Sequence, residues 1–202
     1  METELQILST LPESWNIQFH PLTVDIGVTI LIILILIISS ALISGSEVAY
    51  FSMGPSDKKK LHHKKNKTNE RVLRNLENPE KLLATILVTN NFVNIGIIVL
   101  AAFVSKNLVT IQNSPGIEFI LQVVLITFFL LIFGEILPKV YASHSVLKFS
   151  KFMAFPLLML EKIFRPVNSI LIYSTSFVNK RLQKHQKNIS MDEISQALEL
   201  TS

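Results

Sequence analysis

Cysteine is absent from this chain of 202 residues. Disulfides, thiol nucleophiles and thiolate ligands for soft metal ions are therefore excluded. Lysine and arginine are absent from residues 1–24, where the acidic residues are Glu2, Glu4 and Glu13. A secretory signal peptide begins with a basic segment, so the first apolar stretch is predicted to be a membrane span and not a cleaved leader.

Charge is also missing from three long apolar runs, at residues 26–43, 82–104 and 119–133. A helix that crosses a bilayer needs about 20 apolar residues, and the whole chain has 49% hydrophobic residues and a mean hydropathy of +0.44. We therefore expect an all-α integral membrane protein with three transmembrane helices. Three spans leave little room for a separate soluble domain, so residues 24–180 are predicted to form one membrane domain.

Basic residues are concentrated between the first two runs and after the third. Residues 54–81 contain nine lysines or arginines and four acidic residues, and residues 139–187 contain nine more basic residues. Positive loops stay on the cytoplasmic side of a membrane. The loop 54–81 and the C-terminus are therefore predicted to be cytoplasmic, with residues 1–23 as an extracytoplasmic segment of a multi-pass plasma-membrane protein.

The densest basic cluster, residues 58–67, contains six lysines and two histidines. Juxtamembrane clusters bind anionic lipid headgroups with about 1 kcal/mol per cation, and this interpretation is favoured over nucleic-acid binding. His62 and His63 are adjacent, so their side chains would diverge on a helix instead of converging on a metal ion. Membrane lipids, and no nucleic acid, are the expected partners.

The region after the third run is less uniformly apolar and contains Pro156 and Pro166. Proline inside a helix removes a hydrogen bond, so these residues are expected to break or kink any continuous helix. We interpret residues 145–178 as helices at the cytoplasmic interface, forming a cytoplasmic-side juxtamembrane helical belt. The alternative is a short re-entrant hairpin.

Polar side chains interrupt two of the runs at helical spacing. Asn90 and Asn94 lie near the middle of the second run, and Ser40 and Ser44 lie near the end of the first. Residues four apart share a helix face, so each pair can direct two oxygen atoms at one object. The alternative is that the serines bond back to their own helix and help helices to pack closely.

The third run ends near a carboxylate, Glu135, and a proline, Pro138. Pro138 has no N–H and clashes with the carbonyl of Gly134, which is thereby released from its helix bond. A free carbonyl beside a carboxylate makes an oxygen-rich corner. In the simpler alternative, Glu135 pairs with Lys139 one turn away.

The three runs together offer hard oxygen donors from hydroxyl, amide, carbonyl and carboxylate groups. Such donors suit Mg²⁺ or Ca²⁺ better than softer ions. On these residues alone, a cation site and a hydrogen-bonded helix interface are equally supported. The sequence contains no nucleophile and base pair, phosphate loop or Cys and His metal site, so no enzymatic activity is expected.

Three stretches resemble the signature sequences of the transmembrane domain of the CorC and cyclin M family of magnesium transporters. They are Ser40-x-x-x-Ser44-Gly45-Ser46-Glu47, Leu87-Val88-Thr89-Asn90-Asn91-Phe92-Val93-Asn94 and Phe133-Gly134-Glu135-Ile136-Leu137-Pro138-Lys139. Their order and spacing both match, and the resemblance covers residues 24–180.

The resemblance implies a homodimer in a bacterial inner membrane, with an inward-facing cavity that holds one dehydrated Mg²⁺ per subunit and Na⁺-coupled export. Carried over residue by residue, it assigns the metal site to Ser40, Ser44, Asn90, Asn94, Gly134 and Glu135. The candidates for gating or for a coupling ion are Glu47, Asn91, Pro138 and Lys139. Asn91 lies about 100° around the helix from Asn90, so a packing or cavity-wall role suits it better.

The resemblance also implies a cytoplasmic pair of cystathionine-β-synthase (CBS) domains that binds ATP. Residues 181–202 are predicted to be a linker and the start of a helix toward that module, because Ser190 and Glu193 form a capping pattern. The chain is expected to be cut from a longer protein before it. This last stretch is similar to gliding-motility-associated members, which gives an alternative function: a non-transporting assembly or sensing subunit whose polar residues only pack helices.

Overall fold

The computed structural model describes residues 17–63, 66–111 and 115–173. Within these ranges, three segments are long and apolar enough to cross a membrane: Val24–Phe51 (α2), Pro79–Leu108 (α5) and Phe119–His144. The predicted all-α membrane protein with three spans is confirmed. Each helix extends beyond the uncharged run that predicted it, because only the part inside hydrocarbon must be apolar while the helical hydrogen bonds continue into polar residues.

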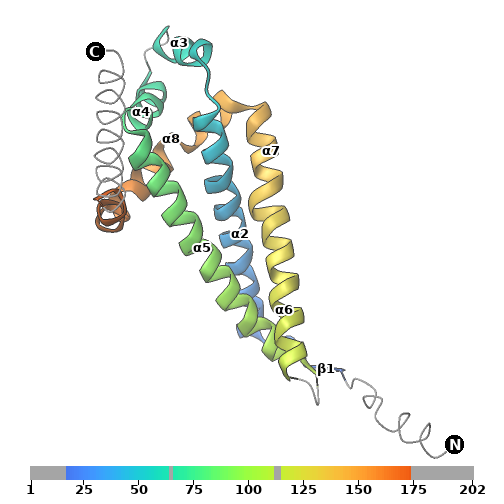
Figure 1. The fold of residues 1–202 in the computed structure, drawn as a ribbon. Helices are drawn as coiled ribbons and strands as arrows, with labels where there is room; N and C mark the ends of the chain where they lie inside the picture. The colour runs from blue at the N-terminus through green and yellow to red at the C-terminus, as the bar shows by residue number, and fades with distance from the viewer. Residues whose placement is uncertain (1–16, 64–65, 112–114, 174–202) are drawn as a thin grey trace, which may run out of the picture. The chain divides into compact units, whose positions relative to one another are not determined.

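The third span is a composite of three helical pieces. They are α6 (Pro115–Phe129), the π-helix η1 (Leu130–Ile136) and α7 (Leu137–His144), of which Figure 1 labels α6 and α7. A π-helix bonds each N–H to the carbonyl five residues earlier and accommodates one extra residue per turn. The irregular backbone predicted around Gly134 and Pro138 is therefore a widened helical turn.

Large apolar side chains are exposed along all three spans. Examples are Leu31 and Ile38 on α2, Phe92 and Ile95 on α5, and Val124 on α6. Contiguous exposed apolar surface is unusual on a soluble monomer. Lipid chains are the natural contact for these side chains, as expected of a multi-pass membrane protein.

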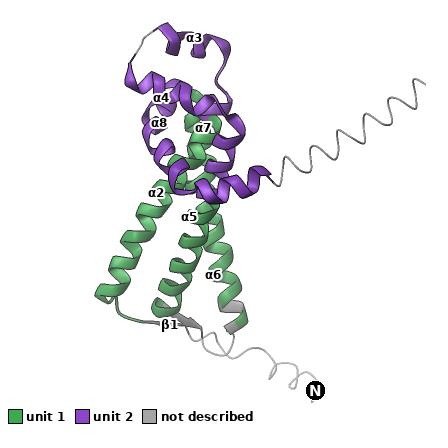
Figure 2. Ribbon diagram, turned by 90° about the vertical axis from the view of Figure 1, so that its left-hand side faces the viewer, with its two compact units in different colours: residues 1–48, 90–145 green, residues 49–89, 146–202 purple. Residues whose placement is uncertain are grey.

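The chain divides into two compact units, which Figure 2 shows in different colours. Unit 1 comprises residues 1–48 and 90–145, and unit 2 comprises residues 49–89 and 146–202. Unit 1 holds most of α2, the second part of α5 and the whole third span, whereas unit 2 holds the remaining helices.

Two short strands in unit 1, β1 (Ile17–Phe19) and β2 (Val109–Ile111), pair in antiparallel fashion, with Ile17 opposite Ile111. Because β1 precedes α2 and β2 follows α5, this pair joins the start of α2 to the end of α5. The two helices therefore run antiparallel, and α6 starts from the same end of the unit (Figure 1). The strands were not predicted, since three residues are too few to show an alternating pattern.

Unit 2 is built from α3 (Pro55–His63), α4 (Lys67–Leu76) and α8 (Val146–Ile163), together with the adjoining ends of α2 and α5. The start of α4 is capped by Asn66, whose side-chain oxygen accepts from the Asn69 N–H at 2.7 Å, a standard cap that satisfies one free helix donor. Helix α4 packs along α8, and both bury apolar side chains, including Val72 and Leu157.

A buried hydrogen-bond network in unit 2 ties the last turn of α2 to α4 and α8. The Tyr50 hydroxyl donates to the Ser150 carbonyl at 3.0 Å. The Asn75 amide donates to the Tyr50 hydroxyl oxygen at 3.0 Å and to the Ala154 carbonyl at 3.2 Å. These contacts satisfy the Tyr50 hydroxyl and the Asn75 amide nitrogen, whereas Asn75 Oδ1 has no partner among the described residues.

Helix α8 corrects one expectation. A break or a kink was expected at Pro156, which lies inside α8 and does not end it, so the break is wrong. The carbonyl four residues earlier belongs to Phe152, an exposed residue, and a freed carbonyl is tolerated where it remains accessible. Residues 165–173 form a further helix that begins beside Pro166. A position of these helices at the cytoplasmic interface stays a prediction, and residues 181–202 lie outside the described part of the chain.

Candidate functional site

Ser40 of α2 lies at the meeting point of the predicted site residues and is fully buried. Its Oγ is 3.1 Å from Asn90 Oδ1 and 2.7 Å from Asn94 Oδ1. A hydroxyl has one proton, so Ser40 can donate to only one of these two amide oxygens at a time. The other amide oxygen then faces Ser40 Oγ without a proton between them, and three oxygen atoms converge with a surplus of lone pairs.

The amide of Asn94 is held in a fixed orientation by the third span. Its Nδ2 donates to Glu135 Oε1 at 3.0 Å. Because the nitrogen faces the carboxylate, the oxygen must face the opposite way, toward Ser40. Glu135 thus orients Asn94 and places a negative charge beside the amide oxygens. We call Ser40, Asn90, Asn94 and Glu135 the oxygen cluster.

Helix η1 brings Glu135 to the cluster. Its hydrogen bonding persists to Leu137, whose N–H donates to the Ile132 carbonyl five residues earlier. Gly134 is buried within this widened turn. Pro138 follows in the first turn of α7 and has no N–H to offer the Gly134 carbonyl. The resemblance-based assignment of that carbonyl as a cation ligand stays a prediction.

Gly134 is also a point of close approach between the third span and α2. A Cβ at this position would lie 3.2 Å from Ser40 Oγ and 3.0 Å from Leu130 Cδ1. Contacts of this length require a neighbour to move, and glycine avoids them because it has no side chain. The glycine therefore sets how near the third span comes to Ser40.

Ser44 lies one turn beyond Ser40 on α2 and is buried, with 1% of its surface exposed. Serines in helices often donate to the carbonyl four residues earlier, as Ser39 and Ser46 do here at 2.8 and 2.7 Å. Ser44 Oγ has no hydrogen-bond partner within the described residues. Burying a hydroxyl without a hydrogen-bond partner lowers the stability of the fold. A ligand bound to this oxygen would restore part of that stability.

The remaining sequence candidates are placed differently. Lys139 Nζ lies 3.1 Å from Glu47 Oε2, so its ion pair is with α2 and not with Glu135 as in the simpler alternative. Asn91 is exposed and makes no part of the oxygen cluster, in line with its predicted place away from the Asn90 face. Among the described residues, no three His, Asp or Glu side chains gather at one point.

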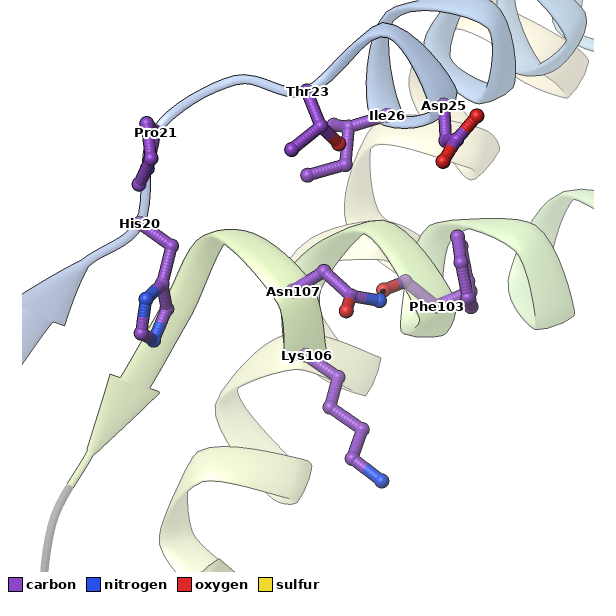
Figure 3. Close-up of a pocket in the computed structure, with 8 residues that line it drawn as sticks. All are labelled: His20, Pro21, Thr23, Asp25, Ile26, Phe103, Lys106 and Asn107. Atoms are coloured by element: carbon purple, nitrogen blue, oxygen red, sulfur yellow. Dashed lines mark hydrogen bonds between the residues drawn. The ribbon is translucent and has the colours of Figure 1, made fainter.

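A pocket of about 410 Å³ lies at the other end of α2, beside the end of α5 (Figure 3). Asp25 and Asn107 lie on its two sides, while the Lys106 side chain extends away from them. The pocket contains none of the predicted site residues. Its polar residues were not singled out from the sequence, because Asp25 and Lys106 read as ordinary helix-end charges.

Two buried asparagines of unit 2 were also missed from the sequence. Asn75 belongs to the network with Tyr50, and Asn168 donates to Thr85 Oγ1 at 2.8 Å. The available signal was the position of Asn75 beside Val72 and Leu76 on the apolar side of α4. A buried amide among apolar residues indicates a hydrogen-bonded partner.

The fold and the oxygen cluster define a multi-pass membrane protein in which polar side chains from three spans meet inside one helical unit. The family model described as "Cyclin M transmembrane N-terminal domain" matches residues 31–202, and the chain belongs to this family. The predicted resemblance is thereby confirmed.

Two relatives agree with this assignment. The chain is 30% identical over 176 residues to the UPF0053 protein of Haemophilus influenzae, an alignment that covers 85% of this chain and 41% of that protein. It is 31% identical over 124 residues to the UPF0053 inner membrane protein YfjD of Escherichia coli, covering 60% of this chain and 28% of that protein. The chain therefore spans less than half the length of each of these relatives.

Proposed function

We propose that this protein is the membrane domain of a divalent-cation transporter and that Mg²⁺ is the transported ion. The observation that carries the proposal is the approach of Ser40 Oγ to two amide oxygens with a single proton among them. A carboxylate, Glu135, lies against the same cluster. Hard oxygens with one negative charge and no thiolate suit Mg²⁺ by chemical type.

The spacing of the oxygens is compatible with Mg²⁺. Mg²⁺ binds six oxygens at about 2.0–2.1 Å in an octahedron, so neighbouring ligands lie about 2.9 Å apart. The Ser40 oxygen is 2.7 and 3.1 Å from the oxygens of Asn94 and Asn90. Both distances are close to the ligand spacing around Mg²⁺.

Each residue has a distinct role in the proposed site. Ser40, Asn90 and Asn94 supply neutral oxygens, Glu135 supplies the charge, and Ser44 supplies the hydroxyl that otherwise has no partner. The carbonyl of Gly134 is the sixth ligand, and a water molecule would take the place of any of these six that does not reach the ion. On binding, the Ser40 proton turns away from the amide oxygens, so all three oxygen atoms present lone pairs to the ion.

The further features of the proposal come from the family. We propose a homodimer in the plasma membrane, with the C-terminus and the loop 54–81 on the cytoplasmic side, an inward-facing cavity and Na⁺-coupled export. In longer family members, ATP would act through CBS domains outside this chain. The excess of basic residues in that loop supports the orientation.

A second candidate function is an assembly or sensing subunit that moves no ion. It is favoured by the fact that Ser40, Asn90, Asn94 and Glu135 already bond to one another across three helices. Interhelical hydrogen bonds of this kind hold membrane helices together. Under this alternative the cluster has a packing role alone.

Thermal melting of the purified chain in Mg²⁺ separates the two candidates. A ligand at 100 times its Kd adds about 2.7 kcal/mol to stability, so Mg²⁺ is expected to raise the Tm. Glu135→Gln and Asn94→Ala are expected to abolish the rise, because one removes the charge and the other an oxygen ligand. Asn91→Ala is the matched control, since it removes an exposed amide from the same helix and is expected to preserve the rise.

Flux measurements in proteoliposomes complete the test. Wild-type protein is expected to move Mg²⁺ above the background of empty vesicles, and Glu135→Gln is expected to return the flux to background. A wild-type Tm that does not respond to Mg²⁺, together with background flux, would favour the packing role. A clear Mg²⁺ response that survives both cluster substitutions would place the ion elsewhere.

A further inference from the structure

One face of α2 carries a row of oxygen-bearing side chains that extends beyond the oxygen cluster. Ser40, Ser44 and Glu47 are spaced by four and three residues. At 100° per residue, Ser44 lies about 40° to one side of Ser40 and Glu47 about 20° to the other. The three side chains therefore share one helix face and follow one another over two turns.

The environment changes along this row from buried to partly exposed. Ser40 and Ser44 are 0% and 1% exposed, whereas the side chain of Glu47 is 33% exposed. Ser40 is engaged by the asparagines, Ser44 Oγ has no partner among the described residues, and Glu47 carries a full negative charge. A carboxylate at the more exposed end of this row attracts a cation more strongly than the buried, neutral hydroxyls do.

The carboxylate of Glu47 is already paired with a cation from the same unit. Lys139 Nζ lies 3.1 Å from Glu47 Oε2, and its side chain is 37% exposed. The lysine follows Pro138 in the first turn of α7. Lys139 lies four positions after Glu135, yet its charge is directed to Glu47 and the Glu135 carboxylate bonds to Asn94 instead.

We propose that Glu47 is a relay site for a divalent cation entering or leaving the oxygen cluster and that Lys139 is a tethered competitor for this site. This inference rests on the proposed transport function. The ammonium group neutralises Glu47 when no metal ion is present. It is displaced when a divalent ion binds the carboxylate, and Ser44 Oγ provides the next oxygen toward Ser40.

The chemistry of the ion pair allows this exchange. Ion pairs with this degree of exposure are weak because water competes for both charges. A lysine on a flexible four-carbon stem can move to solvent without a change in the helices. A divalent ion carries twice the charge of the ammonium group and is attracted correspondingly more strongly to the same carboxylate.

The test compares Lys139→Gln, Glu47→Gln and the double variant in Mg²⁺ flux and Mg²⁺-dependent melting. Lys139→Gln removes the competitor and is expected to lower the half-saturating Mg²⁺ concentration roughly fivefold, the factor that corresponds to a weak ion pair. Glu47→Gln is expected to raise it. The double variant is expected to behave like Glu47→Gln, because removing the lysine has no effect once the carboxylate is gone.

Lys81→Gln is the matched control, because Lys81 forms a different ion pair, with Glu161 at 2.6 Å in unit 2. It is expected to leave the half-saturating concentration unchanged. Lys139→Met keeps the apolar stem of the lysine and replaces Lys139→Gln if that variant does not fold. The Tm of each variant without Mg²⁺ reports any purely structural contribution of the pair.

The outcomes separate this inference from the proposed function. Wild-type protein without Mg²⁺ response or flux would overturn both. Wild-type flux with unchanged half-saturation in Lys139→Gln, or with additive effects in the double variant, would overturn the relay alone. In that case the pair only fastens α7 to α2, and both single variants should lower the Tm by similar amounts.

Discussion

Asparagine side chains have opposite surroundings in the two units. In unit 1, the amide oxygens of Asn90 and Asn94 converge on Ser40 Oγ beside the Glu135 carboxylate. In unit 2, the amide nitrogen of Asn75 donates to two oxygens, one from Tyr50 and one from Ala154. The first arrangement collects lone pairs at one point. The second places the amide nitrogen against two acceptors and leaves Asn75 Oδ1 without a partner among the described residues. The same residue type thus serves a proposed ion site in one unit and helix packing in the other.

The largest expected effect comes from replacing Asn75 by aspartate, which preserves its shape. The two donated hydrogen bonds are lost, and a carboxylate oxygen is placed against the Ala154 carbonyl. Leaving a charge buried without its partners is expected to lower the stability by about 3–5 kcal/mol. The Tm should fall equally with and without Mg²⁺, because no oxygen of this network is proposed to bind the ion.

Asn90→Asp is the matched substitution in unit 1. It keeps the oxygen that faces Ser40 and adds negative charge to a proposed cation site, so Mg²⁺ is expected to raise its Tm by more than that of the wild type. Equal responses of Asn75→Asp and Asn90→Asp to Mg²⁺ would remove the distinction between the two units.

The sequence predicted much of unit 1 because its signals are local and repeated. Uncharged runs of sufficient length predicted the three spans, and polar residues at spacings of four predicted which faces meet. The pairing of Lys139 with Glu47 was not selected, because helical spacing favoured its neighbour Glu135 and a contact between distant helices has no local pattern. Pro138 indicated an irregular backbone, but proline alone does not distinguish a break from a π-helix.

Unit 2 was predicted less well, because contacts between residues far apart in the chain leave no local pattern in the sequence. Its helices are held by contacts such as Tyr50 with Ser150 and Asn168 with Thr85, which join residues far apart in the chain. The sequence around each of them is compatible with several partners. Pro156 was expected to break or kink a helix, and α8 continues through it without a break, because packing of the surrounding turns outweighs the loss of one hydrogen bond.

Gly134→Ala tests how closely the third span must approach the oxygen cluster. The added methyl group would lie 3.2 Å from Ser40 Oγ, and overpacking of this kind costs about 1–3 kcal/mol. The shift of Ser40 is also expected to weaken the Mg²⁺-dependent rise in Tm. Gly96→Ala is the matched control: its methyl group meets Leu36 Cδ1 at an ordinary 3.6 Å, so both stability and Mg²⁺ response should be preserved.

Loss of stability in Gly134→Ala with an undiminished Mg²⁺ response would show that the glycine serves packing alone. The close approach at Gly134 in unit 1 would then serve helix packing, as the hydrogen bonds of unit 2 do, and not ion binding.

The smallest effect on stability, and the most selective one, is expected from Ser44→Ala. Without Mg²⁺ the substitution removes a buried hydroxyl that has no partner within the described residues, so the stability should be unchanged or higher by up to about 1 kcal/mol. With Mg²⁺ the variant loses a proposed ligand, so the ion should raise the Tm by less than in the wild type. Ser46→Ala is the control, because Ser46 already donates to the Leu42 carbonyl at 2.7 Å. If the Ser44 hydroxyl had only a packing role, its removal would change the Tm by the same amount at every Mg²⁺ concentration. A smaller Mg²⁺-dependent rise in Tm with no loss of stability in the absence of Mg²⁺ therefore requires a role in binding the ion.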